Sequence, residues 1–321
     1  MLEQSDGTAW MAMYCLNLLE IALVLARHDP AYEDVATKFF EHFALIATAA
    51  YDKGLWNDDD GFFYDVLSTA DGRRLLMRVR SMVGLLPLCA TTTLGTETLQ
   101  RLPRFAERYR WFVTNRPEAG AVVGQTHVRD GGEGRLLSMV GPVQLERILA
   151  TMLDEAEFLS PHGLRSVSRR HAAEPFVLAL GGTRAAVDYE AAESTTGLFG
   201  GNSNWRGPVW FPLNVLIIEG LRRFAAFFGG DLVVEHPTGS GCKHTLAHVA
   251  DDLEARLVSI FLDDGERRPV FGGYELFQSD PRWREQLWFH EYFHGDTGAG
   301  LGASHQIGWT GLVAELLLHR T

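Results

Sequence analysis

Amide, guanidinium and indole side chains are concentrated in one short segment of the chain, which reads AESTTGLFGGNSNWRGPVWFP over residues 192–212. The polar and aromatic candidates in it are Asn202, Asn204, Trp205, Arg206 and Trp210. Amides and a guanidinium form hydrogen bonds with hydroxyl groups, and flat indoles stack on the apolar faces of pyranose rings. The segment therefore indicates a sugar-binding surface. The competing interpretation is a buried aromatic loop whose polar side chains satisfy backbone carbonyls.

Two acidic residues near opposite ends of the chain could perform acid-base chemistry. Asp6 precedes an apolar helical pattern, and Glu291 opens a Gly-rich stretch that reads HEYFHGDTGAGLGASHQIGW from residue 290. Hydrolysis of a glycosidic bond requires one carboxyl that protonates the leaving oxygen and a second that acts on water or on the sugar. Asp6 and Glu291 are candidates for these roles. Asp6 alone is equally compatible with a simple N-cap of the helix that follows.

The same stretch contains H-E-x-x-H, the zinc peptidase signature, in which His290 and His294 would bind zinc and Glu291 would activate water. That motif requires a continuous helix, and the glycines that follow it favour a loop. Its extended form also lacks the expected glycine and histidine, because the chain has Thr297 and Gly300 at those positions. We therefore expect no bound metal. No GxGxxG, Walker loop or serine nucleophile elbow occurs in the sequence, so we expect no organic cofactor either.

Arginines occur in two clusters that could influence a carboxylate. Arg165 and Arg169 flank two serines in the sequence HGLRSVSRRH, and Arg78 and Arg80 precede an apolar segment. A cationic group beside a carboxylate depresses its pKa, which suits a base better than an acid. The alternative is solvated surface charge. A further candidate, Trp56, belongs to an acidic aromatic turn, and we interpret its indole either as core or as a platform for a sugar.

The composition is that of a soluble globular protein. The chain has 321 residues, of which 46% are apolar and 22% charged, and its formal net charge is −12. This negative charge argues against nucleic acid and anionic membranes as partners. We find no signal peptide and no long apolar run, and the three cysteines have no CxxC spacing. We therefore expect a cytoplasmic protein with a neutral ligand and no membrane partner.

Helical periodicity dominates the hydrophobic pattern, so the sequence predicts an all-α fold. Helices are predicted over residues 8–26, 32–51, 96–114, 143–153, 214–228, 245–262 and 308–319. Long loops are predicted over residues 52–64, 158–170, 190–208 and 290–306, and a weakly patterned loop over 116–134. Residues 176–180 and 185–189, on either side of Gly181 and Gly182, predict one small β-hairpin. No linker divides the chain, so we predict a single domain over residues 1–321.

A series of motifs in this sequence resembles the catalytic domain of family 63 glycoside hydrolases. The motifs are EQSDGTAWMA, GLWNDDDGFFYD, RSMVGLLPL, LSPHGLRSVSR, AESTTGLFGGNSNWRGPVWFPLN, PTGSG and HEYFHGDTGAGLGASHQIGWTGLVA. They are long, they occur in order, and they extend from Glu3 to about Ala314. The family includes mannosyl-oligosaccharide glucosidase and the mannosylglycerate and glucosylglycerate hydrolases. The resemblance is therefore specific for the superfamily and weaker for any one substrate.

The resemblance implies an (α/α)6 toroid of paired helices, with long loops on one face that form the pocket. It also implies cleavage of α-glucosidic bonds with inversion, with Asp6 as the general acid and Glu291 as the general base. An inverting pair should stand roughly 6.5–9.5 Å apart, which leaves room for a water. The substrate-binding residues would be Trp10, Trp56, Asn202, Asn204, Trp205, Arg206, Trp210, Gln306 and Trp309.

The sequence departs from this family in its number of helices. It predicts fewer helical segments than a full (α/α)6 barrel needs, and the proposed acid lies close to Met1. The resemblance therefore implies the C-terminal part of a larger enzyme. Because a positioning error near 1 Å can cost about a hundredfold in rate, we expect this chain alone to be weakly active or inactive. The alternative is a carbohydrate-binding fragment that keeps the aromatic subsite without turnover.

Overall fold

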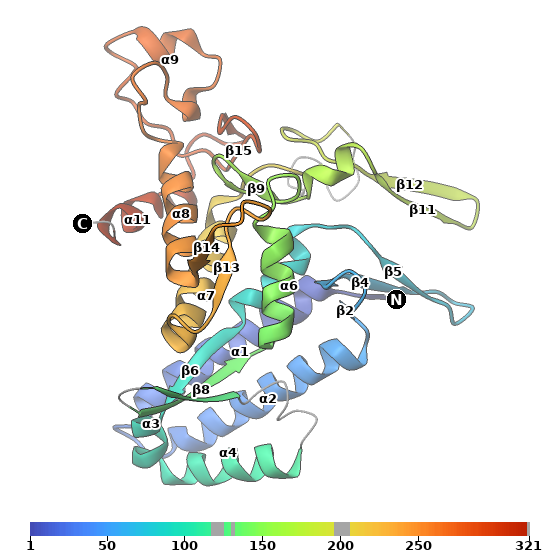
Figure 1. Cartoon of the computed structure of the whole chain (residues 1–321), viewed down its shortest axis with the longest axis vertical. Coiled ribbons are helices and arrows are strands. Elements are labelled where there is room, and N and C mark those ends of the chain that lie inside the picture. The colour runs from blue at the N-terminus through green and yellow to red at the C-terminus, as the bar shows by residue number, and fades with distance from the viewer. Residues whose placement is uncertain (117–124, 130–131, 196–205, 320–321) are drawn as a thin grey trace. The chain divides into compact units, whose positions relative to one another are not determined.

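The computed structural model describes residues 1–116, 125–129, 132–195 and 206–319 (Figure 1). It is 46% helical, and its described part holds ten α-helices and several small antiparallel sheets. The helical character predicted from the sequence is thus confirmed, although strands are more numerous than the one expected hairpin. A closed toroid stays a prediction.

The chain folds into two compact units. The first comprises Met1–Arg78, Val83–Ile148 and Glu219–Leu232, and the second comprises Val79–Met82, Leu149–Ile218 and Val233–Thr321. Helices α6 (Pro142–Met152) and α7 (Phe211–Phe228) contribute residues to both units. The single domain predicted over residues 1–321 stays a prediction.

Three long helices form the framework of the first unit. Helices α1 (Ser5–Leu25) and α2 (Tyr32–Asp52) pack against each other as a hairpin, and α4 (Pro103–Asn115) packs against α2 (Figure 1). Phe40 of α2 is fully buried at the second contact. Its ring contacts those of Phe105, Tyr109 and Phe112, all on α4. Burial of one such ring stabilises the fold by about 1.5–3 kcal/mol.

Helix α1 is long and apolar enough to cross a membrane, and 44% of its most apolar stretch is buried. Among the described residues, α1 is the one helix with this length and composition. One face of α1 packs on α2, and the opposite face exposes an apolar stripe at helical spacing. This stripe consists of Met11, Tyr14, Leu18, Ile21 and Leu25. Length and composition alone also fit a packed helix of a globular core, so the expected absence of a membrane partner stays a prediction.

The helix predicted over residues 96–114 is divided into two. Helix α3 (Thr96–Arg101) ends two residues before Pro103, the first residue of α4. Leu102 between them has φ −118° and ψ 75°, outside the helical region. A proline disfavours helical conformation in the residue before it and cannot donate a backbone hydrogen bond. Pro103 therefore explains the break within a continuous hydrophobic pattern.

The loop predicted over residues 116–134 is wrong for part of its length. Strand β7 (Gln125–Arg129) and the start of β8 (Gly132–Ser138) lie in it, and β8 also pairs with β6 (Thr91–Gly95) in the order β6-β8-β7. β7 is one of the two edge strands of this sheet, and its backbone pairs with that of β8. An edge strand needs no alternating apolar pattern for such pairing, so the sequence shows little sign of it.

Smaller elements complete the first unit. They are the sheet of β1 (Leu2–Glu3), β4 (Asp65–Ser68) and β5 (Arg74–Met77), the hairpin of β2 (Trp56–Asn57) and β3 (Phe62–Phe63), and the 3₁₀ turns η1 (Met82–Gly84) and η2 (Leu86–Cys89). The acidic aromatic turn that contains Trp56 is confirmed, and the chain reverses direction at residues 58–61. Gly61 has φ +63°, and the Asp60 amide donates to the Asn57 side chain at 2.8 Å.

The second unit contains α8 (Leu246–Ser259) together with short hairpins and short helices (Figure 1). Its other elements are β9 (Leu159–Ser160), β10 (Gly163–Leu164), η3 (Arg169–Ala172), β11 (Phe176–Leu180), β12 (Thr183–Val187), β13 (Val233–Glu235), β14 (Lys243–Thr245), η5 (Pro269–Phe271), α9 (Glu275–Ser279), β15 (Tyr292–Phe293), β16 (Gly300–Leu301), α10 (Ile307–Thr310) and α11 (Val313–His319). The predicted hairpin is confirmed as β11 and β12, although its second strand begins two residues earlier than expected.

Candidate active site

Glu291 lies immediately before the hairpin of β15 and β16, and its side chain is half-buried. Its backbone N–H donates to the Ala303 carbonyl at 2.9 Å, and the Ala303 N–H approaches its Oε2 at 3.4 Å. Gly302 has φ +67°, and a Cβ atom added there would come within 2.9 Å of Oε2. A glycine at this position thus allows the carboxylate to lie directly against the backbone.

Aromatic rings flank Glu291. Trp210 stacks on Tyr292 at a centroid distance of 4.7 Å and meets Trp309 edge to face at 6.3 Å. The Trp309 indole N–H donates to the Glu291 carbonyl at 3.0 Å. Trp309 is 38% exposed, whereas Trp210 is only 6% exposed. The Trp210 Nε1 is buried without a hydrogen-bond partner among the described residues. Trp309 is therefore available to a ligand's ring face, and Trp210 retains a donor.

Backbone pairing places the end of the predicted sugar-binding segment beside this hairpin. Val209 and Phe293 exchange two backbone hydrogen bonds, of 2.8 and 3.0 Å. Asn214, which is fully buried, accepts from the Leu164 N–H at 2.7 Å and donates to the Trp210 carbonyl at 2.9 Å. The proximity of Trp210 and Glu291 in the second unit is thus fixed by main-chain contacts.

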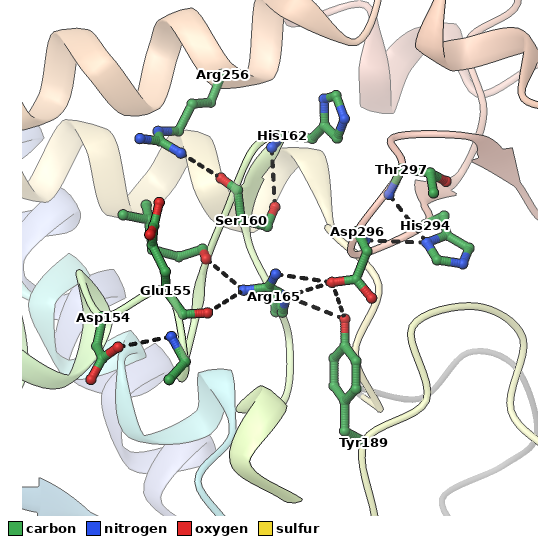
Figure 2. A network of polar contacts seen from close by, with 12 residues as sticks. Asp154, Glu155, Ser160, His162, Arg165, Tyr189, Arg256, His294, Asp296 and Thr297 are labelled. Carbon is green, nitrogen blue, oxygen red and sulfur yellow. Dashed lines mark hydrogen bonds and ion pairs between the residues drawn. The ribbon is translucent and has the colours of Figure 1, made fainter. Parts of the chain in front are cut away.

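A buried arginine ties the loop that follows Glu291 to two other segments (Figure 2). The Arg165 side chain is 3% exposed, and its guanidinium forms an ion pair with Asp296 at 2.9 Å. It also donates to the carbonyl of Leu159 and approaches the Tyr189 hydroxyl at 3.2 Å. The Tyr189 hydroxyl donates in turn to Asp296 at 3.0 Å. We call Arg165, Tyr189 and Asp296 the arginine network.

The pKa values of two side chains in the arginine network, Asp296 and Tyr189, are shifted from their usual values. Burial raises the pKa of Asp296, but the hydrogen bonds and charge of Arg165 and the Tyr189 hydroxyl outweigh it, so the pKa is held below its usual range. Burial raises the pKa of Tyr189 above its usual value, against the opposing charge of Arg165. Asp296 is therefore an ionised partner for Arg165 and holds the loop in place.

His294 does not have the geometry of a zinc ligand in the H-E-x-x-H motif. Tyr292 and Phe293, between the two histidines, form strand β15 and not a helix. The Nδ1 atom of His294 accepts from the Asp296 and Thr297 backbone amides at 3.1 and 3.3 Å. In a strand, side chains four residues apart do not share the helical face on which that motif depends. The zinc interpretation therefore loses its geometric basis.

Arg206 is buried, at 2% exposure, in a pair of acidic contacts. Its guanidinium forms ion pairs with Asp188 and Glu190, each at 2.8 Å, and its carbonyl accepts from the Glu190 N–H at 2.8 Å. These contacts hold the segment after β12 against the start of the apolar stretch at Val209. Arg206 thus has a structural role, and its direct contact with a sugar stays a prediction.

Gln306 and the predicted amides of the first motif complete the candidates in the second unit. The Gln306 side chain is exposed, and its backbone N–H donates to the Phe289 carbonyl at 2.8 Å at the start of α10. Asn202, Asn204 and Trp205 lie outside the described residues. Their predicted roles stay predictions.

Asp6, Trp10 and Trp56 belong to the first unit. Asp6 lies in the first turn of α1 and accepts from the Gly7 N–H at 2.6 Å, so it is not the N-cap, a position held by Gln4. Trp10 stacks on Tyr14 at 6.3 Å, and the Trp56 indole donates to Asp58 at 2.7 Å. Because Glu291 belongs to the second unit, its pairing with Asp6 stays a prediction.

Asp65 is a residue that the sequence analysis did not select. Its carboxylate accepts from the Ser5 N–H at 2.7 Å and so supplies the cap that Gln4 does not provide to α1. Burial raises its pKa, the Ser5 hydrogen bond opposes this, and the charge of Asp6 raises it further. The feature of the sequence that points to Asp65 is its position directly after the buried aromatic residues of GFFYD. Two carboxyl groups therefore interact at the start of α1.

Comparison with known proteins identifies related sequences. The chain is 45% identical to the uncharacterized protein YMR196W of Saccharomyces cerevisiae over 98% of its length, which corresponds to 31% of that protein. It is 25% identical to the mannosyl-oligosaccharide glucosidase of the same yeast over 54% of its length and 15% of that protein. It thus spans less than a third of either relative. A family model for the mannosylglycerate hydrolase MGH1-like glycoside hydrolase domain matches residues 135–310, more than half of the chain. The chain therefore belongs to the MGH1-like glycoside hydrolase family.

Proposed function

We propose that this chain performs the hydrolysis of α-glucosidic bonds with inversion, with Glu291 as general base and Asp6 as general acid. Membership of a glycoside hydrolase family supports this class of reaction and a carbohydrate substrate. The bond type, the stereochemistry and the residue roles are our proposal. We further propose that the helices belong to an (α/α)6 toroid and that the protein is cytoplasmic.

The observation that carries the proposal is the setting of Glu291. Its carboxylate is held against Gly302 and Ala303, and Trp309 and Trp210 lie beside it. A base that takes a proton from water must be fixed within hydrogen-bond reach of that water. The partly exposed indole of Trp309 offers the stacking surface that a pyranose ring needs.

In the proposed reaction, Glu291 removes a proton from a water molecule as the water oxygen attacks the anomeric carbon. The bond between that carbon and the glycosidic oxygen breaks on the opposite face, and the leaving oxygen takes the proton of the Asp6 carboxyl. One water is consumed and two sugars with free hydroxyl groups are formed. Attack opposite to the leaving group inverts the anomeric configuration, so an α-glucoside first yields β-glucose.

The proposal is tested by the rate and the stereochemistry of hydrolysis. Maltose and p-nitrophenyl α-glucoside are incubated with the protein, and the anomeric protons of the product are followed by NMR. Since general acid-base catalysis contributes about 10²–10⁴-fold, we expect Glu291→Gln to lower kcat at least about a hundredfold on both substrates. Asp6→Asn should impair maltose far more than the nitrophenyl glucoside, because nitrophenolate leaves without protonation.

The matched control is Glu97→Gln, which removes an exposed carboxylate paired with Arg101 on the surface. It should leave both rates unchanged. If Glu291→Gln hydrolyses as fast as the wild type, the base assignment is wrong. If α-glucose forms first, inversion is wrong. Binding of maltose without any hydrolysis, both by this chain and by an N-terminally extended form of it, would instead support the alternative of a carbohydrate-binding protein without turnover.

A further inference from the structure

An aromatic pocket lies in the segment that precedes Glu291. It has a volume of about 450 Å³ and is lined by Arg282, Trp283, Gln286 and Trp288. This volume falls in the range of ligand sites, which is about 300–1,000 Å³. Trp283 is 40% exposed. None of these four residues is among the substrate-binding residues inferred above.

The two indoles are held in place by a shared aromatic neighbour. Phe277 meets Trp283 edge to face at 5.5 Å and Trp288 at 4.6 Å. Phe277 also stacks on Phe271, at 5.6 Å, which is buried in the second unit. Edge-to-face pairs of this kind favour fixed ring orientations. The walls of the pocket are therefore ordered before a ligand arrives.

The polar side of the pocket carries an exposed arginine whose charge is paired. Asp280 accepts from the Arg282 backbone N–H at 2.8 Å, and its carboxylate pairs with the Arg282 guanidinium at 3.0 Å. The next arginine, Arg284, pairs with Asp263 at 2.8 Å. Each arginine of the turn thus has a carboxylate partner, which leaves no net positive charge to attract an anion. A neutral ligand fits this balance.

We propose that the pocket formed by Arg282, Trp283, Gln286 and Trp288 is a saccharide-binding subsite, separate from the sugar contacts of Trp210 and Trp309. Indoles supply stacking surfaces, while the Gln286 amide and the Arg282 guanidinium supply donors for hydroxyl groups. The ligand class rests on the proposed function, in which the substrate is a glucoside. The pocket itself rests only on its own geometry.

The position of Trp288 connects the subsite with the proposed catalytic base. Trp288 precedes Glu291 by three residues, so their Cα atoms are at most about 11 Å apart. The Trp288 indole also lies 6.1 Å from the His290 ring and 5.9 Å from that of His305. An oligosaccharide bound at the pocket is therefore held near the reaction centre. We expect longer gluco-oligosaccharides to gain affinity from it.

The test measures binding separately from hydrolysis. Maltotetraose and methyl α-glucoside are titrated by calorimetry into the Glu291→Gln protein, which prevents turnover. Trp283→Ala in that background should weaken maltotetraose binding about tenfold, a loss of about 1.4 kcal/mol. Gln286→Ala, an exposed substitution that removes only an amide, should weaken it less. The control Trp111→Ala removes an indole that is 47% exposed in the first unit and should change nothing.

Each outcome decides between the subsite and the proposed function. Unchanged maltotetraose affinity in both the Trp283→Ala and Gln286→Ala proteins would overturn the subsite, even if hydrolysis proceeds as proposed. Affinity that depends on Trp283, with no hydrolysis either by the wild-type chain or by an N-terminally extended form of it, would support the subsite and remove the proposed function. A proline-rich peptide that binds in a Trp283-dependent manner, where maltotetraose does not, would also overturn a saccharide ligand.

Discussion

The two proposed catalytic carboxyl groups have very different surroundings. Glu291 lies beside a hairpin, and Gly302, Ala303 and Trp309 contact it through side-chain or backbone atoms. The loop that follows it is fixed by the arginine network. Asp6 instead accepts from the adjacent Gly7 N–H, in the first turn of one helix. The surroundings of Glu291 are thus built from distant segments, and those of Asp6 mostly from its own.

The difference shows which contacts hold each of the two carboxyl groups in place. A side chain fixed by several segments keeps its position only if all of them are folded, so substitutions far along the sequence should affect it. A side chain in a helical turn depends mainly on the start of that helix. Substitutions in the arginine network should therefore have larger effects than substitutions at the start of α1.

The largest expected effect is that of Arg165→Met. It removes a guanidinium that is 3% exposed and that donates to the Leu159 carbonyl, and it leaves the Asp296 carboxylate with the Tyr189 hydroxyl but without its cationic partner. We expect a loss of about 3 kcal/mol in the free energy of unfolding, measured by urea denaturation and circular dichroism. Asp65→Ala, which removes the cap of α1, should cost about 1 kcal/mol.

The control for this comparison is an exposed ion pair. Arg73 pairs with Asp71 at 2.8 Å, and their side chains are 61% and 57% exposed. Arg73→Met should change the free energy of unfolding by less than about 1 kcal/mol. Equal losses for Arg165→Met and Asp65→Ala would show that the two regions do not differ in the way their contacts suggest.

The sequence predicted the long helices well but not the contacts that fix the site. α1, α2, α7 and α8 carry strong helical periodicity, which is a local signal. Arg165 was identified only as part of a cationic cluster that could equally have been surface charge. Its partner Asp296 is 131 residues away, and no periodicity connects two residues at that separation. The same holds for Asp65 and Ser5, which are 60 residues apart.

A second prediction concerns Gly302, whose φ is +67° and whose Cβ position lies 2.9 Å from the Glu291 carboxylate. Gly302→Ala should lower kcat for maltose about a hundredfold, because it displaces the proposed base by a substantial fraction of an ångström. Positive φ also strains an alanine by about 1–2 kcal/mol. Stability and maltose hydrolysis are measured together so that the two effects can be separated.

Gly72→Ala is the matched control, since Gly72 has φ +82° and no atom of the described residues lies within 4 Å of its Cβ position. It should carry the same backbone strain and leave kcat unchanged. If both variants lose stability and activity to the same extent, the effect of Gly302 is strain alone. The close approach to Glu291 would then have no part in it.

The smallest expected effects are opposite pH dependences of stability for Asp65 and Asp296. Burial, with the charge of Asp6, raises the pKa of Asp65 against the Ser5 hydrogen bond, so its stabilising contribution is complete at low pH. That contribution is lost as the pH rises above the unfolded value of about 3.9 and through the folded pKa. For Asp296, burial is outweighed by Arg165 and Tyr189, and the pKa is lowered. Its contribution is present above about pH 3.9 and is lost as the pH falls through the folded pKa.

These pH dependences are obtained from the difference in free energy of unfolding between the wild type and each asparagine variant, measured at a series of pH values. The difference in free energy of unfolding between the wild type and Asp65→Asn should shrink as pH rises. The difference between the wild type and Asp296→Asn should grow. Asp6→Asn should reduce the Asp65 slope, because the charge that helps to raise that pKa is gone. If the pH dependence of the Asp65 contribution to stability is the same with and without the Asp6 charge, the two carboxyl groups at the start of α1 do not interact. Asp65 would then titrate through its burial alone.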